Sequence, residues 1–209
     1  MKLTPCVVSV ADHAGWAHVI CVAVSGDLPA VIERRRVTTI DAGVPTMPYH
    51  HESLEMRVDE ANALIARVRR SIAACSARAL REVVGDLAPA HPIVALAIRE
   101  PPFPELPDTV AKVRQSYQLQ CAADGMMYQL ALCHAARDIG LDVDLCRRGE
   151  ETLRAAQQLG VPPDEIETFV SRTGRPSGPP WTQEHRRAYA AGMAALAART
   201  RGRLRIQMP

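Results

Sequence analysis

Residues 5 to 40 read PCVVSVADHAGWAHVICVAVSGDLPAVIERRRVTTI, and this stretch decides the fold that we predict. It holds three extended segments, at about Pro5 to Asp12, Trp16 to Val24 and Val31 to Ile40. Each segment is short and rich in Val or Ile, and turn residues such as Gly15 separate them. Short turns favour antiparallel pairing, so we predict a three-stranded meander with a carboxylate, Asp12, at the end of its first strand.

Helical and extended segments alternate after this meander. Apolar residues at spacings of three and four predict a long amphipathic helix from about Glu52 to Leu87. The run from Ile93 to Ile98 is apolar without alternation, which is typical of a central strand covered on both faces. A helix is expected from Asp124 to Ile139, with Asp124 as its N-cap. We also predict a short strand at residues 143–146 and helices at residues 150–159, 163–173 and 181–200.

This order of elements predicts an α/β fold. Three antiparallel strands followed by parallel strands form a mixed sheet, and the helices cover both of its faces. The length of 209 residues is that of a single domain, which we expect to span residues 1–209.

The composition is that of an ordinary globular protein, with 47% hydrophobic and 23% charged residues. A net charge of +2 argues neither for nor against nucleic acid as a partner. The six cysteines form no CxxC pair, so we expect buried free thiols in a reducing compartment. No apolar stretch approaches the roughly 20 residues that span a bilayer, and no secretory signal is evident, so we expect a cytoplasmic protein.

Two carboxylates follow the two strands that are most buried by pattern. Asp12 ends the first strand, and Glu100 follows the central strand directly after Arg99. If these strands are neighbours, both acids lie at the same edge of the sheet, where ligands of α/β proteins gather. Adjacent carboxylates repel each other unless a cation lies between them, and their oxygens suit Mg²⁺ or Mn²⁺. The alternatives are an ordinary turn residue for Asp12 and a solvent-facing strand end for Glu100.

A meander with an Asp on its first strand, a helix, and an apolar strand ending in Glu resembles the RNase H-like superfamily. The size and helical insertions are most similar to the RuvC-type Holliday junction resolvases, over roughly residues 5–198. The segment Ala11-Asp12-His13-Ala14-Gly15 stands where that family has an Asp-Pro-Gly turn, and Ile98-Arg99-Glu100 stands where it has its strand-end Glu.

The last acids of that family lie on its C-terminal helix, which corresponds to residues 182–191 of this chain. Glu184 and His185 are the candidates there, and the pair of Asp residues common in the family is absent. The resemblance therefore implies a metal-dependent nuclease in which Asp12, Glu100 and Glu184 hold Mg²⁺ or Mn²⁺ and His185 moves a proton.

The resemblance also implies DNA or RNA as the partner and allows a homodimer, whereas the lack of a long apolar stretch predicts no membrane partner. Arginine clusters would bind the phosphate backbone, namely Arg34, Arg35, Arg36, Arg186 and Arg187. The alternative function is a non-catalytic nucleic-acid- or protein-binding module of the same fold, which the missing acid and the near-neutral charge favour. An actin-like ATPase ranks last, because the sequence has no Gly-rich phosphate loop.

Several of these residues have an ordinary structural alternative. An acid such as Glu184 in the first helical turn favours the helix dipole, and a helix histidine such as His185 is more commonly exposed. Paired arginines usually form a solvated face. The segment His50-His51-Glu52 is a weak metal signature and is more typical of a capping loop, whereas His13 and His18 are candidates to line the cleft of Asp12.

Overall fold

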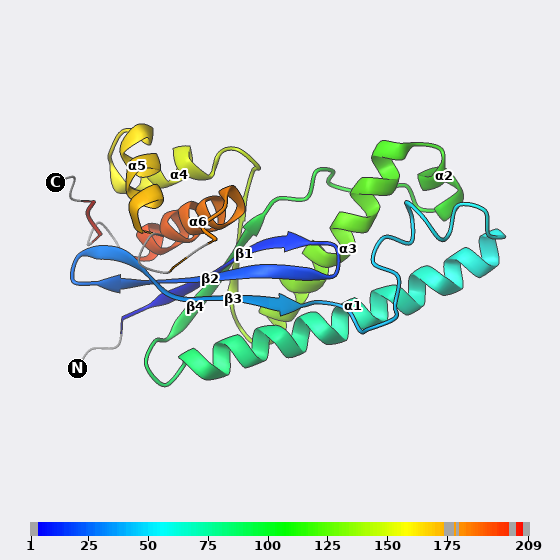
Figure 1. Cartoon of the computed structure of the whole chain (residues 1–209), viewed down its shortest axis with the longest axis horizontal. Coiled ribbons are helices and arrows are strands. Elements are labelled where there is room, and N and C mark those ends of the chain that lie inside the picture. The colour runs from blue at the N-terminus through cyan, green and yellow to red at the C-terminus, as the bar shows by residue number, and fades with distance from the viewer. Residues whose placement is uncertain (1–3, 174–177, 179, 201–203, 207–209) are drawn as a thin grey trace.

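The computed structural model describes residues 4–173, 178, 180–200 and 204–206, and its strands form a five-stranded sheet (Figure 1). The sheet has the order β3-β2-β1-β4-β5, with β1, β2 and β3 antiparallel and with β4 and β5 parallel to β1. The predicted mixed sheet and the predicted adjacency of the first and central strands are confirmed. The strands are β1 (Cys6–His13), β2 (Trp16–Ser25), β3 (Leu28–Thr38), β4 (Ile93–Arg99) and β5 (Asp142–Cys146).

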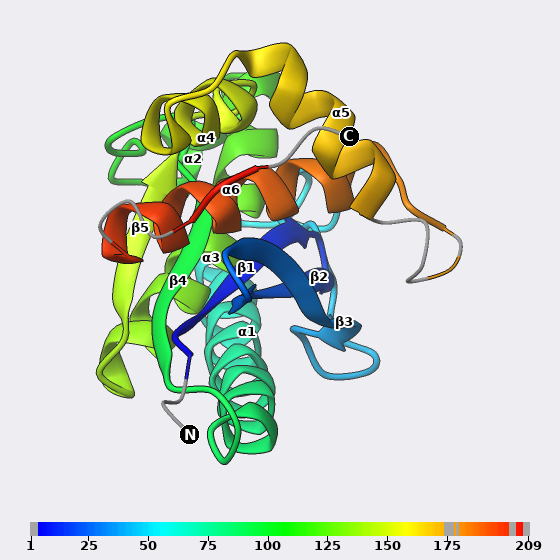
Figure 2. The same cartoon turned by 90° about the vertical axis from the view of Figure 1, so that its left-hand side faces the viewer.

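Helices cover both faces of this sheet, as predicted. The long helix α1 and the helix α3 lie on one face, whereas α6 lies on the other face with α4 and α5 packed against it (Figures 1 and 2). The helices are α1 (Val58–Leu87), α2 (Val110–Arg114), α3 (Tyr117–Asp138), α4 (Glu151–Leu159), α5 (Pro163–Thr173) and α6 (Gln183–Thr200).

A glycine closes the turn between β1 and β2. Gly15 has φ 89°, a left-handed conformation that side chains disfavour. A Cβ at this position would also lie 2.9 Å from the Thr46 methyl carbon. Both restraints require glycine, and the tight turn sets the register that places Asp12 opposite Ala17 near the end of the hairpin.

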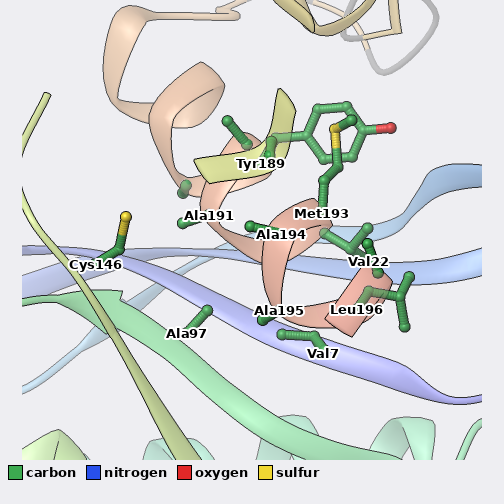
Figure 3. Packing of buried hydrophobic residues seen from close by; sticks show 14 of the residues in the cluster. Val7, Val22, Ala97, Cys146, Tyr189, Ala191, Met193, Ala194, Ala195 and Leu196 are labelled. Carbon is green, nitrogen blue, oxygen red and sulfur yellow. The ribbon is translucent and has the colours of Figure 1, made fainter. Parts of the chain in front are cut away.

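Small residues on α6 let this helix approach the sheet closely. A Cβ on Gly192 would lie 2.7 Å from Cγ2 of Val22 and 3.1 Å from Cβ of Ser9, so a larger residue would push the helix away. Ser9 Oγ donates a 2.6 Å hydrogen bond to the Ala188 carbonyl, which fixes the helix along β1. The labelled side chains Ala194 and Ala195 lie over the sheet beside other small core residues (Figure 3).

Two predicted helix starts are wrong. The first long helix begins at Val58 rather than near Glu52, because the preceding residues 48–55 form turns. The helix expected from Asp124 begins at Tyr117, where the Ser116 side chain accepts a hydrogen bond from the Leu119 amide. Asp124 is therefore not an N-cap but lies two turns inside α3. The five-residue helix α2 was not predicted, since it is too short to show periodicity.

The remaining expectations about the interior agree with the structure. All six cysteines are free thiols, and five of them are buried. The apolar strand β4 is covered on both faces, and the arginine-rich strand β3 lies at the edge of the sheet. Within the described ranges, no helix is both long and apolar enough to cross a membrane.

Candidate functional site

The candidate site lies at the edge of the sheet where β1 and β4 end. The Asp12 carboxylate is almost fully buried there, with 1% of its side chain exposed. Arg99, the last residue of β4, binds this carboxylate through two nitrogens of its guanidinium group. Nε lies 2.9 Å from Oδ1, and Nη2 lies 2.8 Å from Oδ2. A two-pronged charged hydrogen bond of this kind is strong and fixes both side chains. Asp12 is therefore the neutralised partner of Arg99.

Glu100 turns away from this pair. Its amide donates a 2.8 Å hydrogen bond to the Cys146 carbonyl, which draws the chain after β4 towards β5. Its carboxylate accepts a 3.2 Å hydrogen bond from Nε of Arg147, and both side chains are largely exposed. The structure thus brings Arg99, rather than Glu100, against Asp12.

Glu184 lies in the first turn of α6 and lines the same small pocket as Asp12. Oε1 of Glu184 lies 3.6 Å from Nη1 of Arg187, one helical turn further on. Arg148 and the buried Glu151 also line the pocket. Three acids and three arginines therefore share this pocket: Asp12, Glu151, Glu184, Arg99, Arg148 and Arg187.

These side chains do not fit a divalent-metal centre in the arrangement observed. Both Asp12 oxygens are occupied by Arg99, and Glu100 faces Arg147. Across the part of the chain that the structure describes, no three His, Cys, Asp or Glu side chains are grouped so that they could hold a metal ion. Mg²⁺ needs several oxygen ligands in octahedral geometry. The positive charge beside Asp12 is instead supplied by a guanidinium group of the chain itself.

His185 is buried, contrary to the expectation for a helix histidine, with 2% of the residue exposed. Its Nδ1 accepts a 3.1 Å hydrogen bond from the Thr182 amide and lies 2.8 Å from the Thr182 hydroxyl. The ring packs against His18 with 3.9 Å between centroids. Burial lowers the pKa of His185 to about 4, so the ring is neutral at pH 7. Its Nδ1 can therefore accept the hydrogen bond from the Thr182 amide at the start of α6.

The other two candidate histidines form an aromatic cluster at the β1–β2 turn. His13 stacks on Trp16 with 3.9 Å between ring centroids, and the Arg36 guanidinium lies 4.2 Å from the centre of the Trp16 ring. His18 contacts Trp16 edge to face. Neither His13 nor His18 is among the residues that line the pocket of Asp12, although His13 lies close enough to Glu184 and Asp12 to interact with their charges.

The arginines of β3 are divided between the two faces of the sheet by strand alternation. Arg35 binds Asp86 of α1 at 2.7 Å, whereas Arg34 donates a 2.8 Å hydrogen bond to the Pro180 carbonyl near α6. The exposed Arg36 covers Trp16 near the end of β1. On α6, Arg186 is exposed, and Arg187 pairs with Glu184. The five predicted arginines therefore do not form a single surface.

Asp124 has a structural partner in the loop before α1. Its two carboxylate oxygens accept hydrogen bonds, each 3.0 Å long, from the amides of Tyr49 and His50. Burial raises the pKa of Asp124 to about 7. The loop containing His50, His51 and Glu52 is thus fixed to α3, in agreement with a structural role for this segment.

No protein-family model matches the sequence, and no curated protein gives a significant match. Solved structures do match. The Thermus thermophilus RuvC structure has 15% sequence identity to this chain, covers 94% of it and 97% of its own length, and gives a TM-score of 0.53. The chain has a RuvC-like fold. T. thermophilus RuvC in complex with a Holliday junction substrate has 14% identity, coverage of 95% and 97%, and a TM-score of 0.52.

The sequence did not reveal the pairing of Arg99 with Asp12, and this pairing decides how the side chains of the candidate site are arranged. Val10 of β1 lies opposite Ile98 of β4, so a continued register would have brought Glu100 beside Asp12. The strand ends at Arg99, however, and the long arginine side chain reaches Asp12 instead. Only the position of Arg99 directly before the predicted ligand gave a signal for this role.

Proposed function

We propose that the chain binds structured nucleic acid at the sheet edge formed by the ends of β1 and β4. The observation that carries this proposal is the Asp12–Arg99 pair. In a RuvC-like fold this pair removes the negative charge of Asp12, which would otherwise repel a phosphate backbone. Three exposed arginines lie near the same edge and supply positive charge, namely Arg36, Arg148 and Arg147, which also pairs with Glu100.

Arg148 is the arginine best placed to contact phosphate. Its side chain is exposed and lines the pocket of Asp12 as well as the neighbouring cavity. Since few arginines lie at this edge, we expect a moderate salt dependence of binding. Each phosphate contact contributes about 0.9 to the slope of log K against log salt concentration.

The test is fluorescence anisotropy with a four-way junction, a flap and a linear duplex over a range of KCl concentrations. Arg148→Gln should weaken binding to all three ligands and reduce the slope by about 1. The matched control is Arg81→Gln, at an exposed position on the half of α1 that runs towards the opposite end of the sheet (Figure 1). If the wild-type chain binds none of the three ligands at low salt, the proposal is wrong.

The second candidate function is that of a metal-dependent nuclease that cuts structured nucleic acid, as the fold resemblance implies. The observation in its favour is that Asp12 and Glu184 line one pocket. Arg99 would have to release Asp12 before a metal could bind. Cleavage in Mg²⁺ or Mn²⁺ that Asp12→Asn abolishes, while binding persists, would support this candidate over binding alone.

A further inference from the structure

A thiol and an imidazole form a close pair in the loop-and-helix region away from the pocket of Asp12. Sγ of Cys121, on α3, lies 3.2 Å from Nδ1 of His50, which belongs to the loop before α1. Both residues are partly exposed, whereas the other five cysteines of the chain are buried. Cys121 is therefore the cysteine that solvent reaches, and a base lies in direct contact with it.

Contacts to α3 hold His50 in this position. Asp124 lies about one turn after Cys121 on this helix, and its Oδ2 accepts a 3.0 Å hydrogen bond from the His50 amide. The His50 ring also packs edge to face against Tyr117, with 4.8 Å between the ring centroids. The backbone and the ring of His50 are thus both fixed by the helix that carries the thiol.

This geometry suits nucleophilic chemistry at the Cys121 sulfur. The thiolate is the nucleophile rather than the thiol, and an adjacent base generates it by accepting the proton. A neutral imidazole at 3.2 Å can accept this proton and later return it to a leaving group. In contrast, burial raises the pKa of the thiols of Cys75, Cys133 and Cys146, which disfavours the thiolate at those positions.

The cavity that Cys121 lines indicates which reaction partner fits. It has a volume of about 900 Å³ and lies between α3 and the chain that follows β4. Arg147 pairs with Glu100 in its wall, and the exposed Arg148 adds a further positive charge. A small molecule that carries carboxylates therefore fits this cavity better than a cationic molecule.

We propose that Cys121 is a modification site, at which an acidic small-molecule disulfide forms a mixed disulfide with the chain. The Cys121 sulfur attacks one sulfur of this disulfide, and the thiol proton passes to Nδ1 of His50. A new S–S bond forms as the old S–S bond breaks, and the leaving thiolate takes the proton from His50. One thiol is consumed and one is released, and a reducing thiol reverses the reaction. This inference does not depend on nucleic-acid binding.

The test incubates the native chain with oxidised glutathione, which carries carboxylates, and follows the adducts over time by peptide mass spectrometry. One glutathione should appear on Cys121 before any of the five buried cysteines reacts, and Cys121→Ser should remove this adduct. His50→Gln should slow the reaction at pH 7 by about tenfold, because glutamine cannot accept the proton. The matched control is His134→Gln, at an exposed position further along α3, which should react at the wild-type rate.

A neutral disulfide tests the role of charge in the cavity. Arg148→Gln should slow the reaction with oxidised glutathione by roughly threefold, as expected for one exposed ionic contact. The same substitution should leave the reaction with 2-hydroxyethyl disulfide unchanged. Equal effects on the two reagents would overturn the selection for an acidic partner.

A further measurement needs no variant. In urea the pair is lost while every cysteine is accessible, so Cys121 should react about tenfold faster in the native chain than in the unfolded chain. Thermal unfolding checks that each variant is folded. A slower reaction in the native chain, equal rates for wild type and His50→Gln, or a first adduct on a buried cysteine would each overturn the inference.

Discussion

At the scale of single residues, the partner of a buried carboxylate decides what that carboxylate can do. A charge as buried as that of Asp12 is costly unless it is paired and hydrogen-bonded. A divalent metal or a guanidinium group can meet this need, and here the guanidinium of Arg99 does so at 2.9 and 2.8 Å. In this arrangement the buried Asp12 carboxylate is paired with a neighbouring side chain rather than with a metal ion.

His185 should make stability depend on pH. Its folded-state pKa of about 4 lies below the ordinary 6.5, so the unfolded chain takes up a proton first as the pH falls. Neutral His185 therefore makes its full contribution to the free energy of unfolding above about pH 6.5. As the pH falls from about 6.5 to about 4, this contribution decreases by up to roughly 1.4 kcal/mol per pH unit. Urea unfolding at several pH values should therefore show that the free energy of unfolding falls less steeply towards low pH in His185→Asn than in the wild type. The exposed His134→Asn is the control, and equal slopes for wild type and His185→Asn would contradict this cause.

At the scale of elements, short apolar runs predicted the strands of the meander and the central strand, and apolar residues at spacings of three and four predicted the long helix. The strand pairs β1–β2 and β1–β4 follow from apolar runs that are covered on one or both faces. The start of α3 could not be predicted in the same way, because an Asp before Gly imitates an N-cap signal. Asp124 instead binds backbone amides at residues 49 and 50, a contact 74 or more residues away in sequence. No local pattern encodes such a contact.

The buried face of α1 gives a prediction at this scale. Ile65 is 4% exposed within an apolar cluster, whereas Leu64 is only partly buried. Ile65→Asp should therefore lower the free energy of unfolding by roughly 3–5 kcal/mol, and Leu64→Asp by clearly less, since its charge can reach water. The exposed Asn62→Asp is the control on the same turn. Chemical denaturation measures all three, and equal losses at positions 64 and 65 would show that the buried face is assigned wrongly.

At the scale of the whole molecule, the sequence predicted which strand ends meet but not the contacts of the side chains at those ends. Strand order and the turn at Gly15 brought Asp12 to an edge that Glu184 also reaches, as the resemblance implied. The orientation of Glu100 depends on where β4 stops and on its amide bond to Cys146. Such details arise from packing among β1, β4 and β5 together, and a single strand pattern does not contain them.

The response of the whole chain to metal follows from these contacts. Because Arg99 holds both oxygens of Asp12, Mg²⁺ or Mn²⁺ should leave the melting temperature of the wild type unchanged. Arg99→Gln should lower the stability by about 3–5 kcal/mol, since it leaves a buried charge unpaired. Metal should then restore part of the loss only if Glu184 joins the freed Asp12 as a ligand, and by at most about 2.7 kcal/mol at a hundredfold excess over Kd, since it binds only the folded form.

The double variant Asp12→Asn with Arg99→Gln isolates the cause. It lacks the buried charge, so it should be more stable than Arg99→Gln alone and should no longer respond to metal. Differential scanning fluorimetry over a metal titration measures all of these variants. A metal-dependent rise in the wild type that Asp12→Asn removes would mean that a metal displaces Arg99 from Asp12. The Asp12–Arg99 pair would then be the resting state of a metal site, and the nuclease would become the better-supported function.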